Sequence, residues 1–187
     1  MNLTEAFTLR GTIPEPVDYG DTPWGPRIFV AAAEGRIEGD RLKADIVPNR
    51  GGDWLLRIEG SDGAYNVPDI RQTLRTDDGE LILLRGHGFM ELNDAWRRAF
   101  EEGVASDYGD HYLRAVFTFE TGSARYGWLN TRLFLGEGRF PAPTTIGRLA
   151  DGDRDVHGVP GDGHAAAVAG RGKVAAGGGA GLLRQKP

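Results

Sequence analysis

The 187-residue chain contains no cysteine, and this absence excludes several kinds of site. Without a thiol the protein can form no disulfide, thiolate metal site or iron–sulfur cluster, and it has no cysteine nucleophile. Long apolar runs are also lacking, and the N-terminus shows no basic segment followed by an apolar stretch. Because a spanning helix needs about 18 apolar residues or more, we expect no membrane association and a cytoplasmic location.

An excess of positive charge is missing as well. The chain has 22 Lys and Arg against 27 Asp and Glu, which gives a formal net charge of -5. Nucleic-acid phosphates attract a basic stripe on a protein surface, and no basic run occurs in this sequence. We therefore expect no nucleic-acid partner.

Aromatic residues are absent after Phe140, and this divides the chain in two. In residues 141–187, 11 of the 47 positions are glycine, interleaved with Ala, Asp and Arg. Such a composition buries too little apolar surface to offset the entropy of ordering the chain. The sequence therefore predicts a folded domain over residues 1–140 and a low-complexity, mobile tail over 141–187.

Within the first 140 residues, short apolar runs alternate with turn signals, as in "RLKADIV", "DWLLRIEG" and "HYLRAVFTF". Regular short strands separated by Gly, Asp and Pro indicate an all-β barrel or sandwich. Asp78-Gly79 is typical of a type I′ hairpin turn. Residues 92–102 break the pattern and predict one short amphipathic helix, with Asn93 or Asp94 as N-cap and Gly103 at its end.

Four segments, "GGDW" (51–54), "DIRQTLRTDDGELI" (69–82), "HYLRAVFTFETG" (111–122) and "YGWLN…FLGEG" (126–138), together resemble the DUF3237 family, also called UPF0311. The resemblance covers about residues 3–138. It implies an antiparallel, up-and-down (lipocalin-like) β-barrel whose interior solvent can reach. The family carries no general biochemical activity, so the resemblance predicts a fold and leaves the function open.

The C-terminus departs from this resemblance. Family members continue after the "GxG" that Gly136 and Gly138 match with a further strand of Val, Ile, Asp and Tyr character. Here "RFPAPTTIGRLADGDRDVHG" follows instead. We therefore expect the closing strand to be missing, which would leave an unpaired edge that favours association with another chain.

The segment "YGWLN" suggests a ligand site. If residues 126–135 form a strand, Tyr126, Trp128 and Asn130 point to one face, since side chains alternate along a strand. Aromatic walls with polar tips are typical of small-molecule pockets, although an aromatic core gives the same pattern. We predict these three residues, with Trp54 and Asp69, as substrate-binding residues.

Charged residues of the hairpin around Gly79 form a second candidate group. Arg71, Arg85 and His87 would come together with Asp69 if their sides of the two strands face inward, and Asp53 could complete the group. An inward arginine needs a carboxylate or an anionic ligand as partner, and a histidine beside carboxylates is the usual general base. We predict His87, Asp53, Arg71 and Arg85 as catalytic residues. A structural ion pair or a solvated outer face remains the alternative.

These residues favour a small barrel that binds an apolar or aromatic molecule. If it is an enzyme, they suit cofactor-independent acid/base chemistry on an enolisable or phenolic substrate, such as isomerisation, cyclisation or elimination. No metal is expected, since the acidic run "DGDRD" at 151–155 lacks the glycine and glutamate of an EF-hand. The alternatives are a non-catalytic carrier of a hydrophobic ligand and a filled barrel that forms a homo-oligomer through the leucines around 129–135.

Overall fold

The computed structural model describes residues 4–32, 34–141 and 166–174. The predicted all-β fold with one α-helix is confirmed for these residues. The helices are α1 (Asp94–Glu101) and a short 3-10 helix, η1 (Gly127–Thr131). The strands are β1 (Thr4–Ile13), β2 (Val17–Thr22), β3 (Gly25–Ala31), β4 (Glu34–Glu38), β5 (Lys43–Glu59), β6 (Ala64–Val67), β7 (Asp69–Thr76), β8 (Leu81–Glu91), β9 (Leu113–Glu120), β10 (Phe134–Arg139) and β11 (Ala166–Val174).

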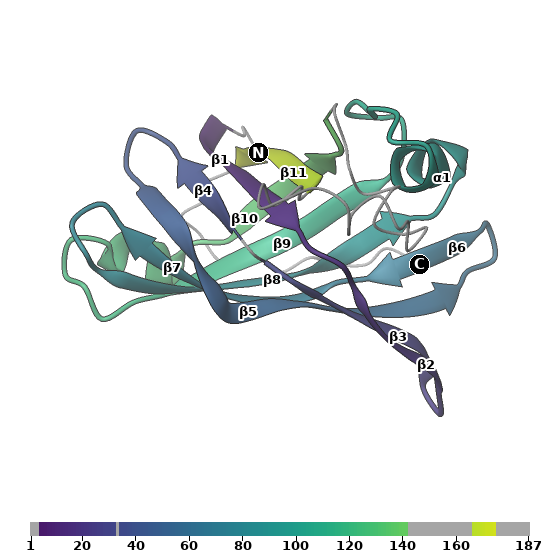
Figure 1. The fold of residues 1–187 in the computed structure, drawn as a ribbon. Helices are drawn as coiled ribbons and strands as arrows, with labels where there is room; N and C mark the ends of the chain where they lie inside the picture. Colours follow the sequence, from purple (N-terminus) through teal and green to yellow (C-terminus); the bar gives the residue numbers. More distant parts are fainter. Residues whose placement is uncertain (1–3, 33, 142–165, 175–187) are drawn as a thin grey trace, which may run out of the picture.

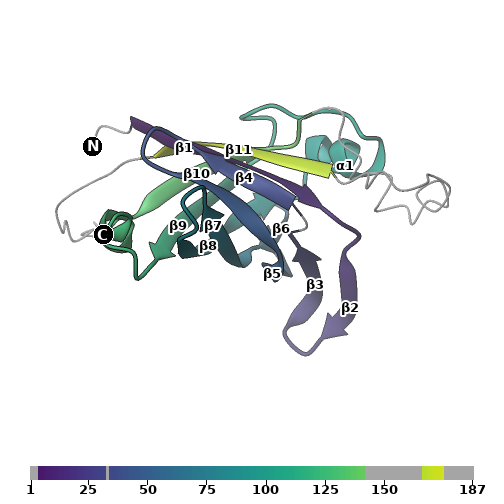
Figure 2. The same cartoon turned by 60° about the vertical axis from the view of Figure 1, so that its left-hand side comes forward.

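The strands pair antiparallel into a closed wall. Hydrogen-bonded neighbours run in the circuit β1–β4–β5–β7–β8–β9–β10–β11 and return from β11 to β1. Most neighbours in this circuit are also neighbours in the sequence, which is the arrangement of an up-and-down barrel. Figures 1 and 2 show the β2–β3 hairpin extending from the wall and α1 lying at one end of it.

The closing strand differs from the expectation. We predicted that the last strand is missing and that 141–187 is a mobile tail, but residues 166–174 form β11 within that range. This strand pairs with β1 from Ile13↔Ala166 to Thr4↔Val174, and with β10 on its other side. Both barrel edges are thereby paired. Residues 142–165 and 175–187, the rest of the predicted tail, lie outside the described residues.

One long hairpin supplies both the barrel wall and the projection. Thr12 pairs with Glu34 in β1–β4, and Val17 pairs with Phe29 in β2–β3. In an antiparallel pair with a constant register, the numbers of opposite residues have a constant sum. That sum is 46 for both pairs, so the register of β1–β4 continues into β2–β3. The half near the termini of this hairpin joins the wall as β1 and β4. In the other half, β3 also pairs with β5 from Arg27↔Leu56 to Ala31↔Gly52, and the turn between β2 and β3 projects from the wall.

The predicted helix is confirmed as α1. The Asn93 side chain accepts a hydrogen bond from the Trp96 backbone N–H at 3.0 Å, which makes Asn93 the N-cap. Gly103 follows the helix with a φ of 65°, a conformation that favours glycine and ends the helix. Among the described residues, no helix is both long and apolar enough to span a bilayer.

The β7–β8 turn was predicted in the right place but with the wrong geometry. A type I′ turn needs positive φ at both central residues, whereas here only Gly79 has a positive φ, of 90°. Thr76 N–H donates to the Glu80 carbonyl at 2.9 Å, and the Thr76 hydroxyl accepts from Glu80 N–H at 2.9 Å. The resulting loop has three residues, with glycine in its last position.

The described core divides into two clusters. The larger fills one end of the barrel. There Phe119 packs edge to face against Phe7 and Phe134, and the Phe7 and Phe134 rings are tilted against each other, with all three centroid distances between 5.0 and 5.4 Å. The smaller lies under α1, and its buried members are Leu55, Met90, Ala99 and Phe140. The buried members of the larger are Phe7, Ile37, Leu42, Ala44, Ile46, Leu74, Ile82, Leu84, Phe119, Tyr126, Leu129 and Phe134.

Truncation tests the role of β11. A chain ending at residue 141 loses β11 and leaves β1 and β10 with unpaired backbone groups, so we expect soluble aggregates or mixed oligomers. A chain ending at residue 174 keeps β11 and serves as the control. Light scattering coupled to size-exclusion chromatography measures the outcome. A short chain that behaves like the control would show that β11 is not needed for closure.

Candidate functional site

The side chain of Asp53, a carboxyl group, lies on the inner wall of the barrel. Residues directly opposite each other in antiparallel strands share a face, and Asp53 stands opposite Val30 on one side and Ile70 on the other. The same row continues through Gly86 to Phe117. Val30 and Phe117 pack against the two core clusters, so the whole row faces inward.

The position of Asp53 raises its pKa. The residue is half-buried on β5 between Ile46, in the larger cluster, and Leu55, in the smaller. Loss of hydration raises the pKa of the carboxyl to about 7, against the lowering effect of the Asp69 N–H hydrogen bond. The carboxyl therefore exists in both protonation states near neutral pH.

The hydrogen bonds of this carboxyl are asymmetric. Oδ1 accepts the Asp69 backbone N–H at 2.9 Å, where the chain passes from β6 to β7 through Pro68. Oδ2 has no hydrogen-bond partner among the residues that the structure describes. Oδ1 thus has a structural role, because it caps the junction between β6 and β7. Oδ2 has no such role and could accept a hydrogen bond from a ligand.

The other predicted catalytic residues do not reach the interior. Asp69 stands opposite His87 and Arg71 opposite Arg85, so the four share a face as expected, but alternation places that face opposite to the one that carries Asp53. His87, Arg71 and Arg85 are exposed. Asp69 pairs with Arg71 at 3.2 Å, outside the barrel. The expected convergence of these residues with Asp53 is therefore wrong.

Trp54 also faces outward, as the neighbour of Asp53 in the strand. Its ring lies against Phe29, with centroids 4.7 Å apart. Gly52 makes room for this pair, since a Cβ there would lie 2.5 Å from the Phe29 ring. The segment "GGDW" thus builds an aromatic pair on the outer wall, and Trp54 does not line the interior.

The segment "YGWLN" is not a strand, so the predicted common face of Tyr126, Trp128 and Asn130 is wrong. Residues 127–131 form η1 in the connection between β9 and β10. Asn130 Oδ1 accepts the Thr121 N–H and its Nδ2 donates to the Thr121 carbonyl, both at 2.9 Å. This side chain imitates one pair of strand hydrogen bonds and closes the loop on itself.

The two aromatic side chains of this segment are engaged in packing. Tyr126 belongs to the larger core cluster, and Trp128 packs against that cluster with the Arg41 guanidinium 3.8 Å from its ring centroid. Burial and the nearby Asp78 carboxylate raise the pKa of Tyr126. Tyr126 O–H donates to Asp78 at 2.9 Å. Both rings therefore serve as core, the alternative left open by the sequence.

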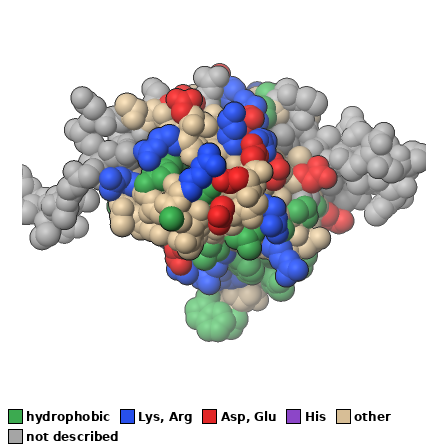
Figure 3. Space-filling model, turned by 90° about the vertical axis from the view of Figure 1, so that its left-hand side faces the viewer, with side chains coloured by type: hydrophobic (Ala, Val, Ile, Leu, Met, Phe, Trp, Pro, Cys, Tyr) green, Lys and Arg blue, Asp and Glu red, His purple; other side chains and the backbone are tan. Residues whose placement is uncertain are grey.

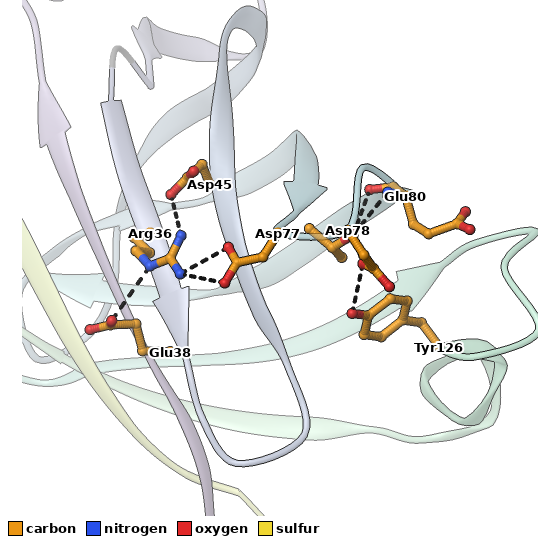
Figure 4. A network of polar contacts seen from close by, with 8 residues as sticks. Arg36, Glu38, Asp45, Asp77, Asp78, Glu80 and Tyr126 are labelled. Atoms are coloured by element: carbon orange, nitrogen blue, oxygen red, sulfur yellow. Dashed lines mark hydrogen bonds and ion pairs between the residues drawn. The ribbon is translucent and has the colours of Figure 1, made fainter.

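Asp78 organises this end of the barrel. Hydrogen bonds from the Thr76 hydroxyl at 2.6 Å and from Tyr126 hold the pKa of Asp78 below its usual value, and Arg125 at 2.8 Å adds to this effect. Figure 4 shows Asp78 in the β7–β8 turn, with its carboxylate bonded to Tyr126. The carboxylate joins the turn to the core, a contact that the sequence analysis missed.

A second ionic network stands beside it. Arg36 on β4 contacts Asp45 at 2.7 Å, Asp77 at 2.9 Å and Glu38 at 3.4 Å (Figure 4). An end view of the molecule shows basic and acidic side chains interleaved across this surface (Figure 3). Such half-exposed pairs contribute little each, and their effect is to fix the mutual position of β4, β5 and the β7–β8 turn.

His111 is buried near α1. Its Nε2 shares a hydrogen bond with Ser106 Oγ at 3.1 Å, and the same Oγ accepts the Phe140 N–H at 3.0 Å. Burial lowers the pKa of His111. Because both side chains are buried and bonded to each other, they serve to fix the loop after α1. Among residues 4–32 and 34–141, no three His, Asp or Glu side chains form a metal-binding group.

These observations define the protein as a closed antiparallel β-barrel with an ionisable group on its inner wall. The chain belongs to the DUF3237 family, proteins of unknown function, whose model matches residues 1–150. A UPF0311 protein of Clostridium acetobutylicum is 27% identical over 136 residues, covering 72% of this chain and 84% of the relative. The predicted resemblance is confirmed.

Solved structures share the fold. A β-barrel-like protein of Acinetobacter baumannii has a TM-score of 0.61 at 24% identity, with 91% of this chain and 94% of that chain covered. An enzyme from Penicillium herquei has a TM-score of 0.51 at 18% identity, with 91% and 93% covered. At these identities the likeness is one of fold.

The sequence analysis also missed the apolar neighbours of Asp53 in the inner row. Ile70 alternates with Asp69 and Arg71, and Phe117 with Val116 and Thr118. The alternation of apolar and polar residues is visible in the sequence, but it does not show which face of the sheet points into the barrel.

The raised pKa of Asp53 predicts a pH-dependent stability. As the pH rises from about 4 to about 7, the unfolded carboxyl ionises while the native one still holds its proton, so the free energy of unfolding falls. Asp53→Asn removes this effect. The free energy of unfolding of the variant minus that of the wild type should therefore rise across that pH range by about 2 kcal/mol, a figure reduced for the partial exposure of the carboxyl. Urea denaturation at each pH measures it. Asp21→Asn, at an exposed residue of β2, is the control, and a constant difference for Asp53→Asn would contradict the raised pKa.

Asn130→Ala tests the loop closure around Thr121. Losing two side-chain to backbone hydrogen bonds should lower the free energy of unfolding by about 1 kcal/mol, measured by urea denaturation. Thr131→Ala, at an exposed neighbour, should change it little. A stability unchanged by Asn130→Ala would show that the closure does not contribute.

Proposed function

We propose that the protein binds a small apolar or aromatic molecule inside the barrel and that Asp53 exchanges a proton with it. The observation that carries this proposal is the inward carboxyl with a pKa near 7 and one oxygen without a partner among the described residues. A general acid or base works best when its pKa lies near the operating pH. The fold likeness to an enzyme from Penicillium herquei agrees with a catalytic use of such a barrel.

The reaction class follows from the groups that surround Asp53. In the inner row its neighbours are apolar side chains and glycine: Val30, Ile70, Gly86 and Phe117. Such a wall suits the carbon skeleton of a phenol or an enolisable ketone. The ionised carboxyl takes the acidic O–H or C–H proton of the ligand, and the resulting acid returns it to another atom, which gives isomerisation, addition or elimination without a cofactor.

The proposal uses Asp53 alone of the four predicted catalytic residues. His87, Arg71 and Arg85 stand on the outer face, so the ligand would be held by apolar contacts and by one hydrogen bond. A carrier without catalysis is the second candidate, since the same wall and the same hydrogen bond suffice for binding.

Native mass spectrometry with a mixture of phenols, enones and short polyketide-like compounds tests binding. We expect a one-to-one adduct with the wild type. Asp53→Asn preserves the shape and the hydrogen bond from Asp69, so it should still bind. If Asp53 is the acid/base group, turnover of the bound compound falls by about 10²- to 10⁴-fold.

Asp21→Asn is the matched control, because it makes the same chemical change at an exposed residue of the β2–β3 hairpin. It should leave binding and turnover close to wild type. A bound compound that is never converted identifies a carrier. The absence of any adduct with the folded wild type, or equal turnover by Asp53→Asn, would contradict the proposed chemistry.

A further inference from the structure

The outer face of β7–β10 is a sheet surface that carries several exposed large hydrophobic side chains. Val116 on β9 stands directly opposite Leu135 on β10, and each is 43% exposed, while Leu133, just before β10, is 64% exposed. Phe89 and Leu81 on β8 are about half exposed. The strands β5, β6 and β11 continue the wall beside β7–β10. In Figures 1 and 2, no described helix or strand crosses the outer side of this sheet.

The charges on this face nearly balance, although the whole chain carries -5. Three acidic residues are paired with arginines: Asp69 with Arg71 at 3.2 Å, Glu120 with Arg85 at 3.1 Å, and Glu137 with Arg114 at 2.6 Å. Glu91, at the end of β8, accepts hydrogen bonds from the Asn93 side chain and the Tyr112 N–H. Arg75, at the end of β7, adds one further positive charge on the same side.

We propose that this outer face binds a second copy of the chain and forms a two-fold symmetric dimer. A two-fold axis near Val116 lays the apolar pair Val116 and Leu135 of one copy on that of the other. Because charges of both signs flank this pair, a copy of the same face meets no net repulsion, whereas a strongly charged partner would find no complementary field.

The size of the face fits a modest dimer. Four strands about 4.8 Å apart and about nine residues long at 3.3 Å per residue give a footprint of roughly 600 Å². Standard interfaces bury about 800 Å² per partner, so a concentration-dependent dimer in the micromolar range is expected. An open depression of about 540 Å³ at the end of this face, lined by Leu83, Glu120 and Asn130 among others, gives room for a side chain of the partner.

Sedimentation equilibrium tests the proposal on the full chain. From low to high micromolar concentration, the mass of the wild type should rise from 20.2 kDa toward twice that value. Leu135→Glu places a charge in the apolar centre and should weaken dimerisation about tenfold or more. Val17→Glu makes the same kind of change at a residue 50% exposed on the β2–β3 hairpin, and it should leave the dimer intact.

The absence of cysteine offers a second measurement that does not depend on a destabilising charge. Val116→Cys introduces the only thiol of the chain, and a spin label there should report a short distance between copies. A monomeric wild type, or a dimer that Leu135→Glu leaves intact, would overturn the proposal. A monomer whose Val116→Cys thiol reacts slowly would also overturn it, and would show that another segment of the same chain covers the face.

Discussion

The antiparallel register of β5 against β7, continued through β8 and β9, determines which side chains meet inside the barrel. In this register Asp53, Ile70, Gly86 and Phe117 form one row, and side-chain alternation assigns their neighbours to the outside. A shift by one residue would exchange the two sets. The raised pKa of Asp53 and the exposure of Arg71 are therefore two results of the same pairing.

Glycine allows this register to hold a large aromatic ring in the interior. A Cβ at Gly86 or Gly136 would lie within about 2.5 Å of the Phe117 ring. The Phe117 ring therefore lies along the inner surface of the wall, against Gly86 of β8 and Gly136 of β10. The inner row from Ile70 through Gly86 to Phe117 is thereby apolar, which agrees with the loss of hydration at the Asp53 carboxyl.

Local patterns predicted the fold well and the site poorly. The helix at Asp94–Glu101 and the strands around the β7–β8 turn follow from periodicity and capping, which are properties of short segments. Asp53 could be recognised as a candidate, but its separation from His87 depends on which face of the sheet is buried, a property of the whole barrel. "YGWLN" failed as a strand because Asn130 bonds to Thr121, a side-chain contact that outweighs strand propensity.

The pairing of β1 with β11 joins residues 4–13 to residues 166–174. Contacts between such distant parts of a chain are slow to form, because a long loop must close before they give any stabilisation. During synthesis β1 leaves the ribosome long before its second neighbour, residues 166–174, is made. The long hairpin of β1–β4 can form without β11, and it protects one edge of β1 until β11 has been made.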